Sequence, residues 1–335
     1  MLAIHCLPAL YGDCFYIKSD DGEFSFFVDC GYKKTYFCEI LKLTRRADFI
    51  ILTHIDEDHI LGAIPLIKDV PYKFGLDKVY LNTPDYFKSF DSFGDISVRQ
   101  AISIDKMLRD KEITKDSLVQ GDVIEVSNTC SIDVISPTNQ ELKVFTEKFL
   151  GDKAFDYKET LISSKSSDQE SFELLSSRPD SVRTKSADYV NASSIAFILK
   201  YENYKVLFLG DSHPSVIVDC LRRRGYSEEK KCYFDYIKLS HHGSISSISM
   251  DLISIIRCSK YIISTIGGRS NHKHPSREAI AKIAVNVDRG KDKEIVFFFN
   301  YPVGSYSVRN GEIASSDELA THKIKFVHSN ILELE

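Results

Sequence analysis

The chain has 335 residues, 43% hydrophobic and 27% charged, which is typical of a globular protein that buries a substantial core. Its formal net charge of −5 excludes a general electrostatic attraction to nucleic acid or to an anionic membrane surface. Any contact with a polyanion must therefore come from a local group of residues.

The eight cysteines are scattered and include no Cys-x-x-Cys pair. This pattern favours buried free thiols in a reducing compartment over a disulfide framework. The first residues lack the regions of a secretory signal peptide, and apolar runs such as residues 295–299 are too short to cross a bilayer. We therefore expect a cytoplasmic protein with no membrane partner.

The N-terminal part is typical of short strands. The candidate strands are residues 2–6, 12–17 and 24–28, and the third ends in Asp29-Cys30-Gly31. The Asp-Asp-Gly at 20–22, between the second and third candidates, is a strong hairpin signal.

An apolar run at residues 49–52 predicts a buried strand, and four candidate metal ligands follow it: His54, Asp56, Asp58 and His59. Open sheets bind ligands at such strand ends. Because Asp58 and His59 are adjacent, their side chains must project in different directions. One loop can therefore supply ligands to two neighbouring metal ions. The alternative is a polar turn in which His59 caps the next helix. It is less favoured because such closely packed His and Asp side chains are costly to bury without a cation.

The rest of the chain alternates helices and strands, with one interruption. The first half continues with a helix from about residue 60, a strand at 79–83, a helix at 102–109 and strands at 123–126 and 130–135. The polar, serine-rich residues 151–189 are interpreted as an insertion within a single domain that covers 1–335. The second half has predicted strands at 195–199, 206–209, 233–239, 261–264, 294–299, 304–308 and 323–327, and a helix from 276 to about 285.

Three further polar clusters follow predicted strands of the second half. Asp211 comes after the first apolar run, and His241 with His242 comes after the next strand. The third cluster lies before the helix at 276 and contains Asn271, Lys273 and His274. The alternatives are a common Gly-Asp turn, a polar loop with paired histidines and a solvated basic loop.

The His-x-Asp-x-Asp-His spacing at residues 54–59 resembles the His-x-His-x-Asp-His signature of metallo-β-lactamase-fold hydrolases, with Asp56 in place of the second His. Together with Gly12-Asp13 and Val28-Asp29-Cys30-Gly31, it is most similar to the subgroup that contains the hydrolase domain of ComEC-type DNA-uptake proteins. The resemblance implies a metallo-β-lactamase-like αββα sandwich, with two mixed sheets packed face to face and helices outside. The residues alone imply an α/β layered protein.

The resemblance also implies roles for the clusters. Asp211 would bridge two ions, and one histidine of His241-His242 would complete the shell of the second. We favour His241, which is nearest the strand end, with His242 as the alternative. Asp29 would orient a ligand histidine. The ligands of the first ion (the first set) would be His54, Asp56 and Asp211. The ligands of the second ion (the second set) would be Asp58, His59, Asp211 and His241.

The first set departs from the resembled pattern. Many members of the fold have a third ligand histidine about twenty residues before the bridging carboxylate, where this sequence has Asn191. His213, near Asp211, is a candidate substitute. Because the set is rich in oxygen ligands, Mn²⁺ or Mg²⁺ becomes a candidate beside Zn²⁺.

These ligands predict a metal-dependent hydrolase that uses two divalent ions, Zn²⁺ or Mn²⁺, to activate a water for attack on a phosphodiester. Asp58 would orient the water, and His274, Lys273 and Asn271 would contact the substrate, with His274 either binding a phosphoryl oxygen or protonating the leaving group. The ComEC-type resemblance further implies that the substrate is DNA or RNA, and therefore that the enzyme is a nuclease. The alternatives are a small-molecule or cyclic-nucleotide phosphodiesterase, a lactonase-like hydrolase and a metal-free binding module.

Overall fold

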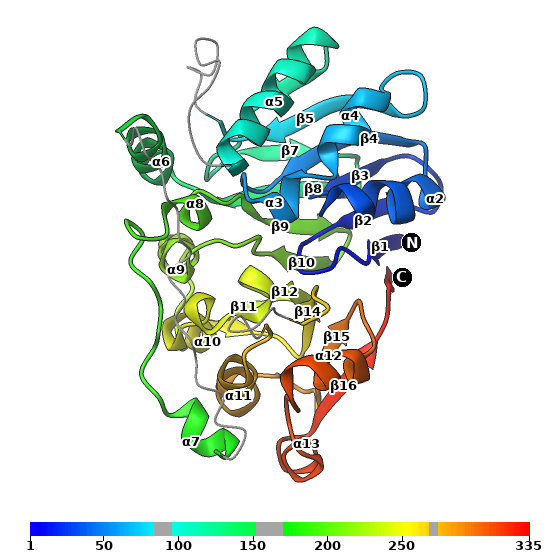
Figure 1. The fold of residues 1–335 in the computed structure, drawn as a ribbon. Coiled ribbons are helices and arrows are strands. Elements are labelled where there is room, and N and C mark those ends of the chain that lie inside the picture. Colours follow the sequence, from blue (N-terminus) through cyan, green and yellow to red (C-terminus); the bar gives the residue numbers. More distant parts are fainter. Residues whose placement is uncertain (84–95, 152–169, 268–273) are drawn as a thin grey trace.

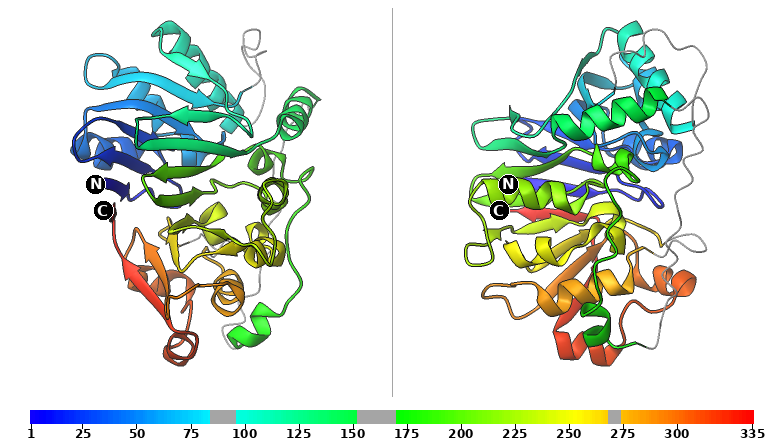
Figure 2. Two further views of the ribbon diagram at one scale, coloured as in Figure 1. Left: turned by 180° about the vertical axis from the view of Figure 1, so that it is seen from behind. Right: turned by 90° about the vertical axis from the view of Figure 1, so that its left-hand side faces the viewer.

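The computed structural model describes residues 1–83, 96–151, 170–267 and 274–335. Two mixed sheets pack face to face, and helices cover the outer face of each (Figure 1). Figure 2 shows the same order of layers from behind and from the side. The predicted α/β class and αββα arrangement are therefore confirmed. Within the described ranges, no helix combines the length and the apolar composition needed to cross a membrane.

The first sheet has the strand order β17-β1-β2-β3-β4-β5-β6. The pairings of β17, β1, β2 and β3 with one another are antiparallel, and β3 to β6 run parallel. Because the last strand of the chain pairs with the first, the two termini lie side by side (Figure 1). The strands are β1 (Leu2–Cys6), β2 (Phe15–Ser19), β3 (Ser25–Val28), β4 (Arg46–Leu52), β5 (Gly75–Leu81), β6 (Thr114–Asp116) and β17 (Ile331–Leu334).

The second sheet has the order β16-β15-β14-β12-β10-β9-β8-β7. The predicted strands at 123–126 and 130–135, from the first half of the sequence, belong to this second sheet. The two halves of the sequence therefore do not coincide with the two sheets. The strands are β7 (Val123–Glu125), β8 (Cys130–Ser136), β9 (Ala196–Tyr201), β10 (Tyr204–Phe208), β12 (Tyr236–Lys238), β14 (Lys260–Ile263), β15 (Ile295–Phe299) and β16 (Ile324–His328), with β11 (Cys232–Tyr233) and β13 (Ile256–Arg257) forming a separate pair.

Helices from both halves of the chain cover the sheets (Figure 1). Residues 304–308, predicted as a strand, lie in a helix, so that prediction is wrong; Val303 and Tyr306, three residues apart, pack one helix face onto the core. The helices are α1 (Lys33–Thr35), α2 (Leu41–Leu43), α3 (Glu57–Ile60), α4 (Ala63–Asp69), α5 (Ile96–Asp110), α6 (Asn139–Gly151), α7 (Phe172–Ser176), α8 (Tyr189–Ala192), α9 (Pro214–Arg223), α10 (Met250–Ile255), α11 (Arg277–Asn286), α12 (Val303–Asn310) and α13 (Ser316–His322).

Three apolar clusters fill the interfaces of the sandwich. Along β4, Phe49 and Ile51 contribute to the cluster between the sheets, whereas Ile50 and Leu52 pack under the helices. This alternation is the two-residue period of a strand buried on both faces. With apolar side chains on both faces, polar side chains gather where the strands end.

Of the segment predicted as an insertion, the structure describes residue 151 and residues 170–189. There α7 buries Phe172 and Leu175 in the cluster outside the second sheet, and Arg178 lies 3.1 Å from Glu278 of α11. This part of the chain therefore packs onto the core. The single domain and the bounds of the insertion stay predictions.

Candidate metal centre

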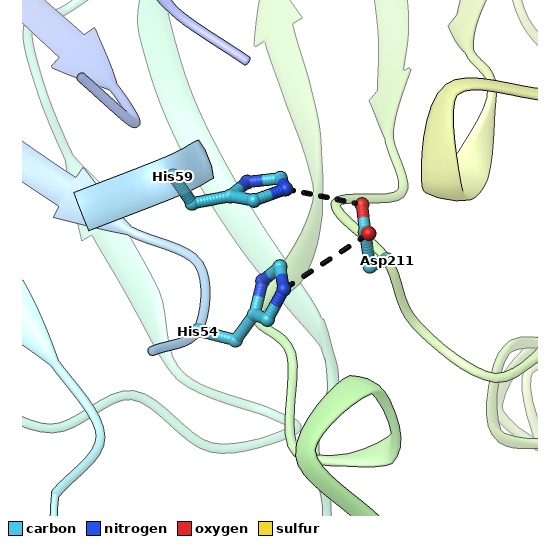
Figure 3. A group of neighbouring side chains, drawn as sticks. All are labelled: His54, His59 and Asp211. Carbon is cyan, nitrogen blue, oxygen red and sulfur yellow. Dashed lines mark ion pairs between the residues drawn. The ribbon is translucent and has the colours of Figure 1, made fainter. Parts of the chain in front are cut away.

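The loops that follow β4, β10 and β12 meet at one end of the two sheets. His54 and His59 come from the first loop and point toward Asp211 of the second (Figure 3). The six predicted ligands are all brought together here: His54, Asp56, Asp58, His59, Asp211 and His241. The loops after β10 and β12 meet because these two strands run parallel in the second sheet, and the packing of the two sheets brings the loop after β4 to the same end.

Asp211 lies at the middle of this group and is 4% exposed. Its Oδ1 atom lies 3.7 Å from Nε2 of His59, and its Oδ2 atom lies 4.0 Å from Nε2 of His54. Oδ2 is also 4.0 Å from Nε2 of His241. The two oxygens of one carboxylate thus face two different sets of side chains.

The remaining carboxylates extend these sets. Asp56 Oδ2 lies 3.4 Å from Nε2 of His54, on the side of Asp211 Oδ2. Asp58 Oδ1 lies 3.9 Å from Nε2 of His59, and its Oδ2 lies 3.3 Å from Nε2 of His242. His242, the alternative ligand in the sequence, therefore lies with Asp58 and His59, whereas His241 faces the oxygen of Asp211 that His54 also faces.

These atoms fit divalent cations. Two ligand atoms that each bind one ion at about 2.0–2.2 Å can be at most about 4.4 Å apart, and the separations above fall within that limit. Buried polar atoms normally have hydrogen-bond partners. In the described part of the chain, the buried atoms that have none include Nε2 of His54, His59 and His242, and Oδ1 of Asp211. Imidazole and carboxylate groups arranged in this way suit Zn²⁺ or Mn²⁺.

His59 is held in one orientation from behind. Its Nδ1 atom donates to Oδ2 of Asp29 at 2.7 Å. Thr53 donates to both oxygens of the same carboxylate, from its backbone N–H and its hydroxyl, each at 2.8 Å. Asp29 therefore fixes the ring of His59, in agreement with the expectation that this carboxylate orients a ligand histidine.

The turn Ser240–Gly243 holds its two histidines in an uncommon backbone conformation. His241 and His242 have φ angles of 48° and 55°, in the left-handed region, which costs non-glycine residues roughly 1–2 kcal/mol each. The Nδ1–H of His242 donates to the backbone oxygen of Ser264 at 2.9 Å, so Nε2 faces Asp58. Such strain is tolerated where the surroundings fix it and is common at functional sites.

The charges of the group shift its pKa values strongly. Burial by itself would lower the pKa of His59, but three neighbouring carboxylates, Asp29 first among them, raise it well above its usual value. Burial would also lower the pKa of His242, but neighbouring carboxylates, Asp13 most of all, raise it to about 9. Burial would raise the pKa of Asp58, but His59 and His242 lower it to about 2. Without cations, protonated histidines therefore compensate the carboxylates.

Other predicted residues lie around the group or away from it. The ring of His274 lies 5.2 Å from that of His241, and Asn271 and Lys273 lie outside the described residues. His213 uses both ring nitrogens elsewhere, Nε2 at 2.5 Å from the backbone oxygen of Arg183 and Nδ1 at 2.9 Å from Ser215 Oγ. It is therefore not a substitute ligand.

Two polar residues of the site were missed or undervalued in the sequence. Ser194 Oγ, two residues after the end of the helix that contains Asn191, accepts from the backbone N–H of Asp211 at 3.1 Å. Lys238 of β12 is 1% exposed and lies 3.9 Å from Asp211 Oδ1. A charged residue in the predicted strand 233–239, three residues before a His-His pair, is a signal that could have found Lys238.

No protein-family model and no curated protein matches the sequence. Solved structures that match include YhfI from Bacillus subtilis, described as a metallo-beta-lactamase fold protein, at 11% identity and a TM-score of 0.42, covering 99% of this chain and 100% of that one. Zn²⁺-bound PqqB from Methylobacterium extorquens matches at 13% identity and a TM-score of 0.46, covering 100% of both chains. The short form of human tRNase Z matches at 11% identity and a TM-score of 0.41, covering 89% of this chain and 92% of that one. At this level the likenesses carry no conclusion about activity.

Proposed function

We propose that the chain is a metal-dependent hydrolase that binds two divalent cations and cleaves phosphodiester bonds. The observation that carries the proposal is the position of Asp211, whose Oδ2 faces His54 and whose Oδ1 faces His59. A carboxylate shared in this way suits two ions about 3.5–4 Å apart, as in two-metal phosphatases and nucleases.

The distances support one histidine of the His-His pair in each set. The first set would be His54, Asp56, Asp211 and His241, and the second Asp58, His59, Asp211 and His242. When bound, two such ions supply Lewis-acid catalysis and a water that ionises near neutral pH. Because both sets have two carboxylates, Mn²⁺ is a candidate beside Zn²⁺.

The remaining chemistry belongs to the side chains at the solvent side of the group. The side chains of Asp56 and Asp58 are 25% and 24% exposed, whereas those of His54 and His59 are fully buried. Substrate would therefore approach past the two aspartates. There Asp58 would accept a proton from the attacking water, and His274, beside His241, would donate one to the leaving oxygen.

Nucleic acid is the substrate class that we propose first, on the resemblance of the motifs to the ComEC-type subgroup. The tract Arg222–Arg224 at the end of α9 does not add to this proposal. The guanidinium of Arg224 donates twice to Asp133, at 2.7 and 2.8 Å, and Arg222 lies 3.5 Å from Asp251. The tract is thus largely engaged in ion pairs on the protein itself. The cytoplasmic location stays a prediction.

The test joins metal analysis to a cleavage assay. Purified protein would be loaded with Zn²⁺, Mn²⁺ or Mg²⁺ and assayed on labelled single- and double-stranded DNA and RNA, and on a bis(nitrophenyl) phosphate. We expect two bound ions and cleavage that is lost in the double variant D58A/H59A. Activity on the small diester alone would select the small-molecule alternative, and hydrolysis of lactones alone a lactonase-like enzyme. Absence of bound metal, or cleavage that survives in D58A/H59A, would overturn the proposal.

A further inference from the structure

Lys238 is a buried cation beside the proposed bridging carboxylate. It forms an ion pair with Asp13, which is 1% exposed, and donates to the backbone oxygen of Gly210 at 3.2 Å. Its ammonium also lies 3.9 Å from Oδ1 of Asp211. Taking two charges out of water has a desolvation cost that can exceed their mutual attraction, so the pair is weak evidence for stability by itself. Its position suggests a role in the centre.

Asp13 extends the contact from Lys238 to a histidine. Its Oδ1 lies 3.3 Å from Nδ1 of His242, on the opposite side of the ring from the nitrogen that faces Asp58. Asp29 lies behind His59 in a similar position, but there the contact is a hydrogen bond of 2.7 Å, whereas the Nδ1–H of His242 donates to Ser264. Each histidine of the second set therefore has one aspartate behind it.

The loop that carries Asp13 is fixed from both sheets. The backbone N–H of Asp13 donates to the backbone oxygen of Asp58 at 3.3 Å. Ser264 Oγ, at the end of β14, donates to the backbone oxygen of Gly12 at 2.8 Å. Asp13 is thus tied both to the loop that carries Asp58 and His59 and to the strand that accepts from His242.

Lys238 also completes the charge balance of the centre. Five carboxylates surround the two ligand sets: Asp13, Asp29, Asp56, Asp58 and Asp211. Two divalent cations would supply four positive charges, and the ammonium of Lys238 supplies the fifth. With neutral ligand histidines, the loaded centre would then carry no net charge, which matters because unpaired charge in a buried site is costly.

We propose, on the basis of the two-ion hydrolase above, that Asp13 and Lys238 are a positioning pair of the metal centre. Asp13 places a negative charge 3.3 Å from Nδ1 of His242, beside the hydrogen bond from that nitrogen to Ser264, and so helps to hold the ring for the second ion. Lys238 fixes Asp13 and contributes the positive charge that balances the centre when two ions are bound.

The pair is tested by metal affinity, without an activity assay. Zn²⁺ and Mn²⁺ binding would be measured by competition with a chromophoric chelator in the wild type, D13N and the double variant D13N/K238M. Removing a carboxylate behind a ligand histidine typically weakens metal binding by about 10–100-fold. We expect a loss of that size for one of the two ions in both variants. The loss should be larger in D13N, because Lys238 then has an uncompensated charge beside Asp211.

K282M is the matched control, because Lys282 is also fully buried in an ion pair, with Asp180 at 2.8 Å, on another part of the fold. It should bind both ions as the wild type does. The double variant leaves no unpaired buried charge, so it keeps the test available where D13N alone fails to fold. Wild-type affinity for both ions in folded D13N/K238M would overturn the positioning role, and equal affinities of D13N and the double variant would overturn the charge role. A wild type that binds no ions would instead reject the proposed function.

Discussion

Nδ1 of His59 lies 2.7 Å from Oδ2 of Asp29, although the two residues come from loops after different strands. Because an ionised carboxylate only accepts hydrogen bonds, the proton of the ring must lie on Nδ1. In the neutral ring that a bound cation requires, Nε2 carries the lone pair, on the side of Asp211, 3.7 Å away. A neutral ring held in this tautomer is the form that binds a metal ion.

This contact predicts the effect of Asp29→Asn. The amide keeps the size of the side chain but loses the charge that fixes and polarises His59, so the affinity for one ion should fall by about 10–100-fold. Titration with Zn²⁺ in competition with a chelator measures this affinity. Asp110→Asn, at an exposed position, is the control and should bind both ions normally. Unchanged affinity in Asp29→Asn would show that the contact does not support metal binding.

Asp211→Asn should affect both ions at once, because the two oxygens of Asp211 face the two sets. We expect loss of tight binding at both positions. A ligand present at 100 times its dissociation constant stabilises the native state by about 2.7 kcal/mol. A chelator should therefore lower the melting temperature of the wild type but not that of Asp211→Asn. Two retained ions in the variant would contradict a bridging role.

The two adjacent histidines should separate into different sets. His241→Ala should weaken the ion beside His54, and His242→Ala the ion beside Asp58. Each variant should therefore retain one tightly bound ion, and the double variant should lose both. Metal content after dialysis measures this. If either single variant kept two tightly bound ions, the histidine that it lacks would not be a metal ligand.

The stability of the metal-free protein should fall as the pH rises. His242 has a pKa of about 9 in the folded protein against 6.5 in the unfolded chain, so its proton stabilises the native state. This contribution is complete below about pH 6.5 and is lost as the pH passes about 9. The raised pKa of His59 acts in the same direction. Thermal unfolding in a chelator should show the decline, and His242→Gln should reduce it. A melting temperature that rises over this range would contradict the shift.

Gly12 is expected to tolerate no side chain. A Cβ atom there would lie 1.8 Å from the backbone oxygen of Asp58, so either the loop or Asp58 must move. Gly12→Ala should therefore lower both the melting temperature and the metal affinity. Gly304→Ala is the control, because its Cβ would meet nothing within 4 Å, and alanine in a helix gains about 0.5–1 kcal/mol over glycine. Wild-type metal binding in Gly12→Ala would show that this close approach does not position Asp58.

The spacing of residue types along the chain predicted many of the strands and the residues of the candidate site. The run 49–52 predicted a strand, which the structure confirms, and the four residues His54, Asp56, Asp58 and His59 predicted a ligand loop, because neighbouring residues must share one short loop. The same logic identified Asp211 and the His-His pair after later strands. It failed at 304–308, where a short run with mixed side chains fits either a strand or a helix, and packing against the second sheet selected the helix.

Only the tertiary structure decided how these groups face one another. Pairing of β10 with β12 placed the loops that carry Asp211 and His241 side by side, and packing of the two sheets brought the loop after β4 against them. Left-handed backbone at His241 and His242 then directed one ring toward Asp211 and the other toward Asp58. Lys238 and Asp13, from different sheets, became an ion pair only when the sheets packed. Spacing along the chain fixes which residues are neighbours in a loop, whereas contacts between loops depend on long-range packing that no local pattern encodes.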